Sequence, residues 1–471
     1  MNTAIRPVVK DPGHAAPGAL GERIADACVS QSAREISATV MEKIKTCLFD
    51  FIGCAIESRE LPWSMQAKSL AQPATGDSSG ASIIGRPAKA SGADAAFANA
   101  VMGHGLVRED MHSGSVSHLG IVVLPVTLAL SQYRKVSGRQ FCAAVVAGYE
   151  VGARIGRAAM TPEIARIHRP TGISGPIGGA VAGASLLGLD RDATVSAIAL
   201  GTNTVLGFNE WAHTGGSEMF FQAGYAARNA LTAARLAEAG AFASPSALDG
   251  EAGLFASLGK RAAASAVTVF DGEPEIMSVY HKPVPACNFA QTPSQAALAV
   301  IQQSGIEPEA IASIHVRVPR AGMLYPGCNH SGPFASVLQA KMSIQYNVAA
   351  ALLKGSVTEL NFRRLDDPAL HRLINMIRLE VDDEMTQAYP GRQGSEVEIE
   401  SADGKRHRMR LADVVNATAG EVRERFRDQA VKAFGEVHAR KVEAFVDNIE
   451  NAEDAGGLAG LLGVEARAHI D

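Results

Sequence analysis

The sequence pattern of this chain changes near the stretch His281-Lys-Pro-Val-Pro-Ala-Cys-Asn-Phe-Ala-Gln-Thr292, which lies directly ahead of an apolar helix pattern at 293–301. Each proline fixes its own φ and biases the preceding residue toward extended geometry, so Lys282 and Cys287 are expected on a stiff loop. Such a loop can position a titratable amine as a catalytic base. The alternative interpretation is a proline-rich connector that carries a solvated lysine.

Before this stretch, from about residue 20 to 265, the pattern is helical almost throughout. Apolar residues recur at the 3–4 spacing of a helix face in segments 41–54, 93–105, 122–132, 139–159, 175–187 and 224–239. Beyond about residue 270, segments 311–318 and 377–381 alternate as strands do. Segments 396–400 and 407–411 flank Asp403-Gly404, a dipeptide typical of a β-hairpin.

These patterns predict a mainly α protein in which a large all-helical domain carries a smaller α+β lid domain. We expect the helical domain over 20–268, the lid over 269–415, and a return to the helical domain over 416–465. A chain of 471 residues is too long for one ordinary core, which agrees with this division.

The composition excludes several classes of protein. A net charge of −5 gives no support to nucleic-acid binding, which needs a basic face. The six cysteines contain no C-x-x-C pair, so neither a disulfide framework nor a zinc site is predicted. Segments 119–132 and 170–189 are too short or too weakly hydrophobic to span a membrane and are expected to be buried helices. With no signal-peptide pattern at the N-terminus, we expect a cytoplasmic protein without membrane partners.

A polar cluster lies between two apolar helix patterns. It comprises His104, Arg108, Glu109, Asp110, His112 and His118. Polar groups between buried helices must be hydrogen-bonded internally or face a cavity, although a surface turn is the alternative. The spacing does not predict a metal site, because no H-x-x-x-H lies on a clear helix and no carboxylate completes a triad of ligands.

A second candidate site is His168-Arg169-Pro170, which precedes the helix pattern at 175–187. The free N–H groups and partial positive charge of a helix N-terminus, next to an arginine, suit a carboxylate or phosphate. No G-x-G-x-x-G follows a strand here, which argues against a dinucleotide site. The alternative for Arg169 is a structural salt bridge. Tyr325, on a turn, is a weaker candidate whose hydroxyl could reach a ligand.

In their order and spacing these segments resemble the MmgE/PrpD family, over about 32–444. The motifs are Asn99…His104…His118-Leu-Gly, Gly148-Tyr-Glu150, Pro170-Thr-Gly172, Lys282-Pro-x-Pro-Ala-Cys287 and Lys341-Met-Ser-x-Gln-Tyr346. The family includes 2-methylcitrate dehydratase, cis-aconitate decarboxylase and iminodisuccinate epimerase. The resemblance implies a homodimer that binds a small di- or tricarboxylate between the two domains and requires no cofactor or metal.

The chain departs from the family pattern at several positions. Val107-Arg-Glu-Asp-Met111 stands where decarboxylases and dehydratases of the family tend to carry Asp-x-Asp-Asp-Thr. Arg169 replaces a histidine, a later lysine aligns near Met219, and Cys287 stands where decarboxylases place a histidine. Of the proton carriers that the resemblance implies, His118 and Lys282 remain.

Gaining arginines makes the pocket more cationic, which favours a substrate rich in carboxylates and a carboxylate-stabilised carbanion. We therefore predict an epimerase acting on an iminodisuccinate-like polycarboxylate, with Lys282 as a neutral base and His118 as the partner that returns the proton. The alternatives are a lyase of the dehydratase or decarboxylase type and a relative that only binds a polyacid. The predicted substrate-binding residues are Arg169, His168, Arg108, His112, Cys287 and Tyr325.

Overall fold

The computed structural model describes residues 18–31, 35–74, 80–205 and 207–468. The α-helices of the first 260 residues are α1 (Leu20–Gln31), α2 (Ala38–Glu57), α3 (Pro62–Ser69), α4 (Gly92–His104), α5 (Gly120–Leu130), α6 (Gly138–Ala159), α7 (Pro162–Ile167), α8 (Pro170–Leu187), α9 (Arg191–Thr202), α10 (Trp211–Thr214), α11 (Glu218–Glu238) and α12 (Leu254–Ser257). The later ones are α13 (Gln291–Ser304), α14 (Arg320–Leu324), α15 (Val337–Met342), α16 (Ile344–Lys354), α17 (Pro368–Met376), α18 (Asp383–Ala388), α19 (Ala419–Phe434), α20 (Glu436–Asp447) and α21 (Gly456–Leu462).

The strands are fewer and short. They are β1 (Ala81–Ile83), β2 (Arg86–Ala90), β3 (Met111–His112), β4 (Val279–Tyr280), β5 (Ile311–Val318), β6 (Ile377–Val381), β7 (Ser395–Ser401) and β8 (Arg406–Leu411). They form two small antiparallel pairs, β1–β2 and β3–β4, and one four-stranded sheet in the order β6-β5-β7-β8.

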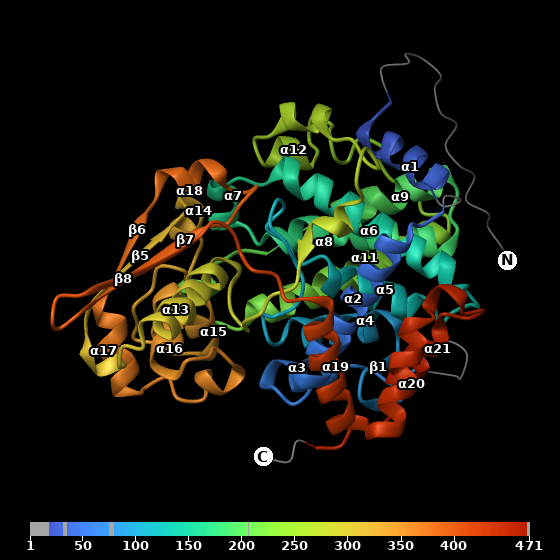
Figure 1. The fold of residues 1–471 in the computed structure, drawn as a ribbon. Helices are drawn as coiled ribbons and strands as arrows, with labels where there is room; N and C mark the ends of the chain where they lie inside the picture. Colours follow the sequence, from blue (N-terminus) through green and yellow to red (C-terminus); the bar gives the residue numbers. More distant parts are fainter. Residues whose placement is uncertain (1–17, 32–34, 75–79, 206, 469–471) are drawn as a thin grey trace.

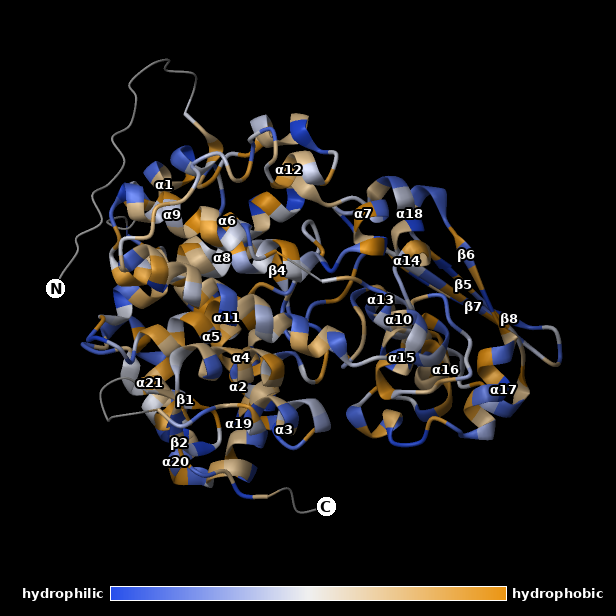
Figure 2. Ribbon diagram, turned by 180° about the vertical axis from the view of Figure 1, so that it is seen from behind, coloured by the Kyte–Doolittle hydropathy of each residue, from blue (hydrophilic) through white to orange (hydrophobic). Residues whose placement is uncertain are grey.

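The helical part is built around α5, α8 and α11, with α4 and α6 packed against them. Every residue of α5 is buried, and hydrophobic residues concentrate along these central helices (Figure 2). Small residues allow the close contact between α6 and α8: a Cβ on Gly178 would lie 2.6 Å from the backbone oxygen of Gly148. The helix axes can therefore approach more closely than larger side chains would permit.

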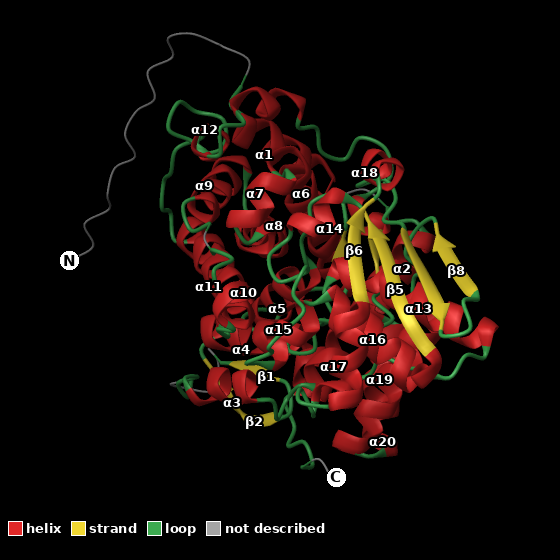
Figure 3. Cartoon of the chain, turned by 90° about the vertical axis from the view of Figure 1, so that its left-hand side faces the viewer, coloured by secondary structure: helices red, strands yellow, loops and turns green. Residues whose placement is uncertain are grey.

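The smaller part contains the four-stranded sheet, which lies to one side of the helical part in Figure 1. Within it, β5 pairs in parallel with β6 and antiparallel with β7. Helix α13 packs against β7 and β8, and α17 against β5. β8 alternates exposed and half-buried residues, so one face of this strand is solvated. Figure 3 shows the strands of the sheet side by side, seen from the side of the smaller part. The predicted strands 311–318 and 377–381 and the predicted hairpin are confirmed.

A strand pair and the returning chain help to join the parts. β3 pairs with β4, so that Met111 lies opposite Tyr280. After the sheet, the chain returns to the helical part, where α19 packs against α2 and α20 packs on α19. The mainly α class with a smaller α+β domain is confirmed. The hairpin β1–β2 was not predicted, since its strands of three and five residues interrupt a helical pattern. Within the described residues, no helix has both the length and the hydrophobicity needed to cross a bilayer.

Candidate active site

The polar cluster of 104–118 forms a buried loop between α4 and α5, and this loop contains two strained residues. Val107 has φ 59° and Val116 has φ 53°. Positive φ is costly for a β-branched residue and persists only where the surrounding structure enforces it. The conformation of Val107 is held from outside the loop, because the Lys282 Nζ donates to its carbonyl oxygen at 2.6 Å.

The β3–β4 pair brings the lysine stretch to this loop. Met111 and His112 pair with Tyr280 and Val279, and Lys282 follows two residues after Tyr280. A second lysine reinforces the contact: the Nζ of Lys341 donates to the carbonyl of Leu106 at 3.0 Å. Two successive carbonyls of the loop are thus held by two fully buried lysines.

Glu109 lies at the centre of the cluster. Its Oε1 is 2.6 Å from Nδ1 of His104 and 2.8 Å from Nδ1 of His118. Its Oε2 is buried without a hydrogen-bond partner among the described residues. Burial alone would raise the pKa of Glu109, but its contacts with the two histidines and the charge of Lys282 hold this pKa well below its ordinary range. The carboxylate is therefore ionised.

Hydrogen-bond partners fix the tautomer of His104. A guanidinium can only donate, and Nη2 of Arg169 lies 2.9 Å from Nε2 of His104. Nε2 must then accept, which leaves the proton on Nδ1, where it is donated to Glu109. Burial lowers the pKa of His104, in agreement with a neutral ring.

The same argument applies to His118. Its Nδ1 lies 3.0 Å from the carbonyl oxygen of Asp110 and 2.8 Å from the Glu109 carboxylate, and both are acceptors. Nδ1 therefore carries the proton and Nε2 keeps its lone pair. Burial, followed by the charge of Lys282, lowers the pKa of His118 to about 3. His118 is a neutral imidazole with one basic nitrogen available.

Arg169 precedes α8 and is almost fully buried. Its Nη1 donates to the Tyr325 hydroxyl at 2.8 Å, and its Nη2 donates to His104. Both partners are neutral, and in the part of the chain that the structure describes no carboxylate forms an ion pair with Arg169. A buried cation without a counter-ion is a strong attractor for an anionic ligand.

These groups surround a small inner cavity. It is lined by Val107, Met111, Val116, His118, Arg169, Met219, Cys287, Asn288, Phe289, Tyr325 and Met342. Its volume of about 10 Å³ is enough for roughly one water molecule. Lys282 is not among the lining residues. It lies behind them, where burial lowers its pKa while the charges of Glu109 and Cys287 oppose that effect.

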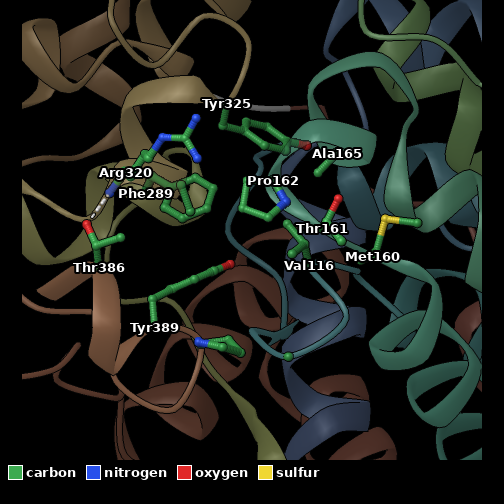
Figure 4. A pocket seen from close by; sticks show the side chains of 13 residues that line it. Val116, Met160, Thr161, Pro162, Ala165, Phe289, Arg320, Tyr325, Thr386 and Tyr389 are labelled. Carbon is green, nitrogen blue, oxygen red and sulfur yellow. Dashed lines mark hydrogen bonds between the residues drawn. The ribbon is translucent and has the colours of Figure 1, made fainter. Parts of the chain in front are cut away.

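A larger pocket adjoins the inner cavity, since Val116, Phe289 and Tyr325 line both. Its volume is about 190 Å³. In Figure 4 one side is formed by Met160, Thr161 and Pro162 of the helical part, and the other by Phe289, Arg320 and Tyr389 of the smaller part. The larger pocket thus lies between the two parts.

The structure brings together five of the eight predicted site residues: Lys282, His118, Arg169, Cys287 and Tyr325. The other three lie elsewhere. Arg108 Nη2 pairs with Glu57 at 2.5 Å, and the ring of His168 packs against Phe208. His112 bonds Ser115 at 2.8 Å and Glu275 at 2.8 Å. None of these three residues lines either pocket.

The expectation that no carboxylate completes a ligand set was wrong. Ligand atoms of His104, Glu109 and His118 all lie within 4.8 Å of one another, a spacing that a metal ion could bridge. Both Nδ1 atoms carry protons here, and Arg169 donates to the second nitrogen of His104, so the set forms a hydrogen-bonded network in this structure. Sequence reasoning placed His104 and Glu109 in the cluster but gave them no role, because no periodicity relates 104, 109 and 118.

Asp110 gives a prediction on stability. Burial raises its pKa from 3.8 to about 6, although the Tyr149 hydroxyl donates to it at 2.5 Å. The folded state therefore binds more protons than the unfolded state between these values, and stability falls as pH rises through this window, by about 3 kcal/mol in all. We expect Asp110→Asn, which keeps an acceptor for Tyr149, to remove this slope. This prediction is checked by urea denaturation of the wild type and of Asp110→Asn between pH 4 and pH 8. If the free energies of unfolding of the two proteins change with pH in parallel, the prediction is contradicted.

Comparison with known families identifies the class of protein. The MmgE/PrpD N-terminal domain matches residues 22–266, and the MmgE/PrpD C-terminal domain matches residues 284–451. The chain belongs to the MmgE/PrpD family.

Two individual proteins are similar over most of their length, and a third is similar over less than half. The cis-aconitate decarboxylase-like protein oryM of Aspergillus oryzae is 26% identical over 464 residues, which cover 92% of this chain and 94% of that protein. A cis-aconitate decarboxylase of Aspergillus terreus is 24% identical over 476 residues, with 93% and 94% covered. A further Aspergillus terreus cis-aconitate decarboxylase is 30% identical over 215 residues, which cover 44% of this chain and 43% of that protein. These relatives are named as lyases, which favours the lyase alternative over the predicted epimerase.

Proposed function

We propose that this protein is a lyase that acts on a small di- or tricarboxylate of the cis-aconitate type by moving a proton at a carbon next to a carboxylate. The observation that carries the proposal is the buried Arg169, which has no carboxylate partner among the described residues and lines the same inner cavity as His118, the imidazole with an unprotonated Nε2. Arg169 would bind one substrate carboxylate and stabilise negative charge that develops on it.

The apolar side of the inner cavity supports decarboxylation in particular. Val107, Met111, Met219 and Met342 line it and offer no hydrogen bond to a carboxylate. An ionised carboxylate held against these side chains would be poorly solvated, whereas departing CO2 carries no charge. Breaking the C–C bond leaves an electron pair on the substrate, which must then be protonated by a group in the cavity.

Epimerisation is the second candidate. It is favoured by the presence of more than one proton carrier around one cavity, with His118 and Cys287 among its lining and Lys282 behind. Two carriers could remove a proton from one face of a carbon and return it to the other.

One experiment separates the two candidates. The protein is incubated in D2O with cis-aconitate, and separately with each stereoisomer of iminodisuccinate, and products are followed by NMR. Loss of CO2 from cis-aconitate supports the lyase. Deuterium uptake with inversion, and without loss of any fragment, supports the epimerase. If neither loss of CO2 nor inversion is observed with cis-aconitate or with the iminodisuccinate stereoisomers, the proposal is contradicted.

Arg169 gives a prediction on binding. We expect Arg169→Met to weaken substrate binding by roughly 1.5–3 kcal/mol, which is typical of a hydrogen bond to a charged group. Arg320→Met is a matched control, because Arg320 lines only the outer pocket and its pairing with Glu163 is exposed to solvent. Steady-state kinetics measure the change in KM. An unchanged KM in Arg169→Met would show that the guanidinium only holds His104 and Tyr325 in place.

A further inference from the structure

Cys287 differs from the five other cysteines of the chain in its surroundings. All six are buried and free, but among them only Cys287 lines the inner cavity. It is the N-cap of a short 3-10 turn that runs into α13, so its sulfur lies at the start of a helical segment. The backbone N–H of Phe289 donates a hydrogen bond to it.

A second cysteine contacts the Cys287 sulfur. The two Sγ atoms of Cys287 and Cys328 are 3.5 Å apart, which is hydrogen-bonding distance for thiols. Burial and the neighbouring Cys287 raise the pKa of Cys328 well above its ordinary value, so Cys328 stays a thiol and is the donor of the pair. Cys287 is thus the acceptor of two hydrogen bonds, one from Cys328 and one from Phe289.

The charges of two cations, Lys282 and Arg169, also act on the Cys287 sulfur. Burial alone would raise the pKa of the Cys287 thiol, but the two hydrogen bonds and the nearby charges of Lys282 and Arg169 hold this pKa below its ordinary value. Hydrogen-bond donors and cations around a sulfur favour the thiolate. The charge of Cys287 in turn opposes the lowering of the Lys282 pKa by burial.

We propose that Cys287 is a catalytic residue, the group that exchanges a proton with the substrate carbon in the inner cavity, and that Lys282 and Cys328 are positioning residues that keep its sulfur anionic. This inference rests on the proposed function and adds the second proton carrier to it. His118 and Cys287 line the same cavity, whereas Lys282 does not.

The proton balance of the step is simple. The Cys287 thiolate takes H⁺ from the carbon next to a carboxylate, so a C–H bond breaks and an S–H bond forms. The electron pair left on the substrate is delocalised into the carboxylate bound by Arg169, or, in an eliminating lyase, forms a C=C bond while the departing group leaves with the electron pair of its own bond to carbon. In decarboxylation the step runs in the other sense: the thiolate first takes up a proton from solvent, its S–H bond then protonates the carbon from which CO2 has left, and the thiolate remains for the next turnover.

The first test measures the thiolate without any substrate. The ultraviolet absorbance of thiolate is recorded against pH for the wild type, for Cys287→Ser and for the double variant Cys287→Ser/Cys328→Ser, so that the titration of Cys287 is distinguished from that of Cys328. The other cysteines do not interfere, since burial raises the pKa of Cys28 and of Cys142 to about 12 and burial also raises the pKa values of Cys47, Cys54 and Cys328. We expect Cys287 to titrate below the roughly 8.5 of a free cysteine. Titration at or above that value would overturn the inference.

The second test measures turnover. We expect Cys287→Ser to lower the rate by about 10²–10⁴, as for loss of a general acid or base, with little change in KM. Cys142→Ser is the matched control, because Cys142 is a buried cysteine of α6 that lies outside the site. Cys328→Ala should shift the acidic limb of the pH–rate profile to higher pH, and Cys328→Ser, which restores a donor, should reverse the shift.

The outcomes separate the two proposals. A wild-type protein without activity on any di- or tricarboxylate would contradict the proposed function, and the role of Cys287 would fall with it. An active wild type whose Cys287→Ser variant keeps the wild-type rate would overturn the role of Cys287 and leave the proposed function in place. Circular dichroism and thermal unfolding of each variant confirm that a loss of rate is not a loss of fold.

Discussion

Replacing His118 by glutamine is expected to lower the rate of product formation from the true substrate by a factor of about 10²–10⁴. The physical reason is that Nε2 of His118 is the unprotonated nitrogen in the inner cavity, while its Nδ1 proton is held by Glu109 and the Asp110 carbonyl. A glutamine amide approximates the shape and can still donate, but it cannot accept a proton from carbon at neutral pH.

This variant also distinguishes the two candidate reactions. In an epimerase with two proton carriers, His118→Gln would leave deuterium exchange measurable from one stereoisomer while blocking inversion. In a lyase the variant would only lose product. NMR in D2O measures both the deuterium exchange and the formation of product. A variant that turns over the substrate at the wild-type rate would remove His118 from the mechanism.

The second large effect is expected for Lys282. We expect Lys282→Ala to lower the rate of solvent deuterium exchange at the substrate carbon, again by a factor of about 10²–10⁴, while the protein stays folded. Lys282 is fully buried, and its charge acts on Glu109, His118 and Cys287. Its removal therefore changes the protonation of the groups at the cavity even though its own side chain does not line it.

Lys341→Met is the control for this variant. Lys341 is an equally buried lysine that donates to the carbonyl of Leu106, next to the Val107 carbonyl that Lys282 holds. It also pairs with Glu359 at 2.6 Å and does not line the inner cavity. We expect Lys341→Met to lower thermal stability and to keep exchange. If Lys282→Ala retains wild-type turnover, neither a direct nor an indirect role for Lys282 survives. If both variants lose activity to the same extent, the lysines act only by shaping the loop.

The sequence alone determined the fold class and the location of the main site segments. Periodicity distinguished the helical part from the sheet at 311–318 and 377–411, because a half-buried strand and an amphipathic helix repeat with different periods. Motif order indicated the family, and it placed Arg169, His118, Cys287 and Lys282 in segments that meet in space.

The tertiary structure decided which polar residues share the cavity. Arg108, His112 and Glu109 lie within five residues of one another in the sequence, yet only Glu109 contacts His118. Arg108 and His112 are paired with Glu57 and Glu275, residues 51 and 163 positions away. The loop also contains the β3–β4 pair and the positive φ of Val107, and both depend on partners distant in the chain. Local sequence patterns report on neighbours along one element, whereas the direction and protonation of a buried side chain follow from the groups that pack against it.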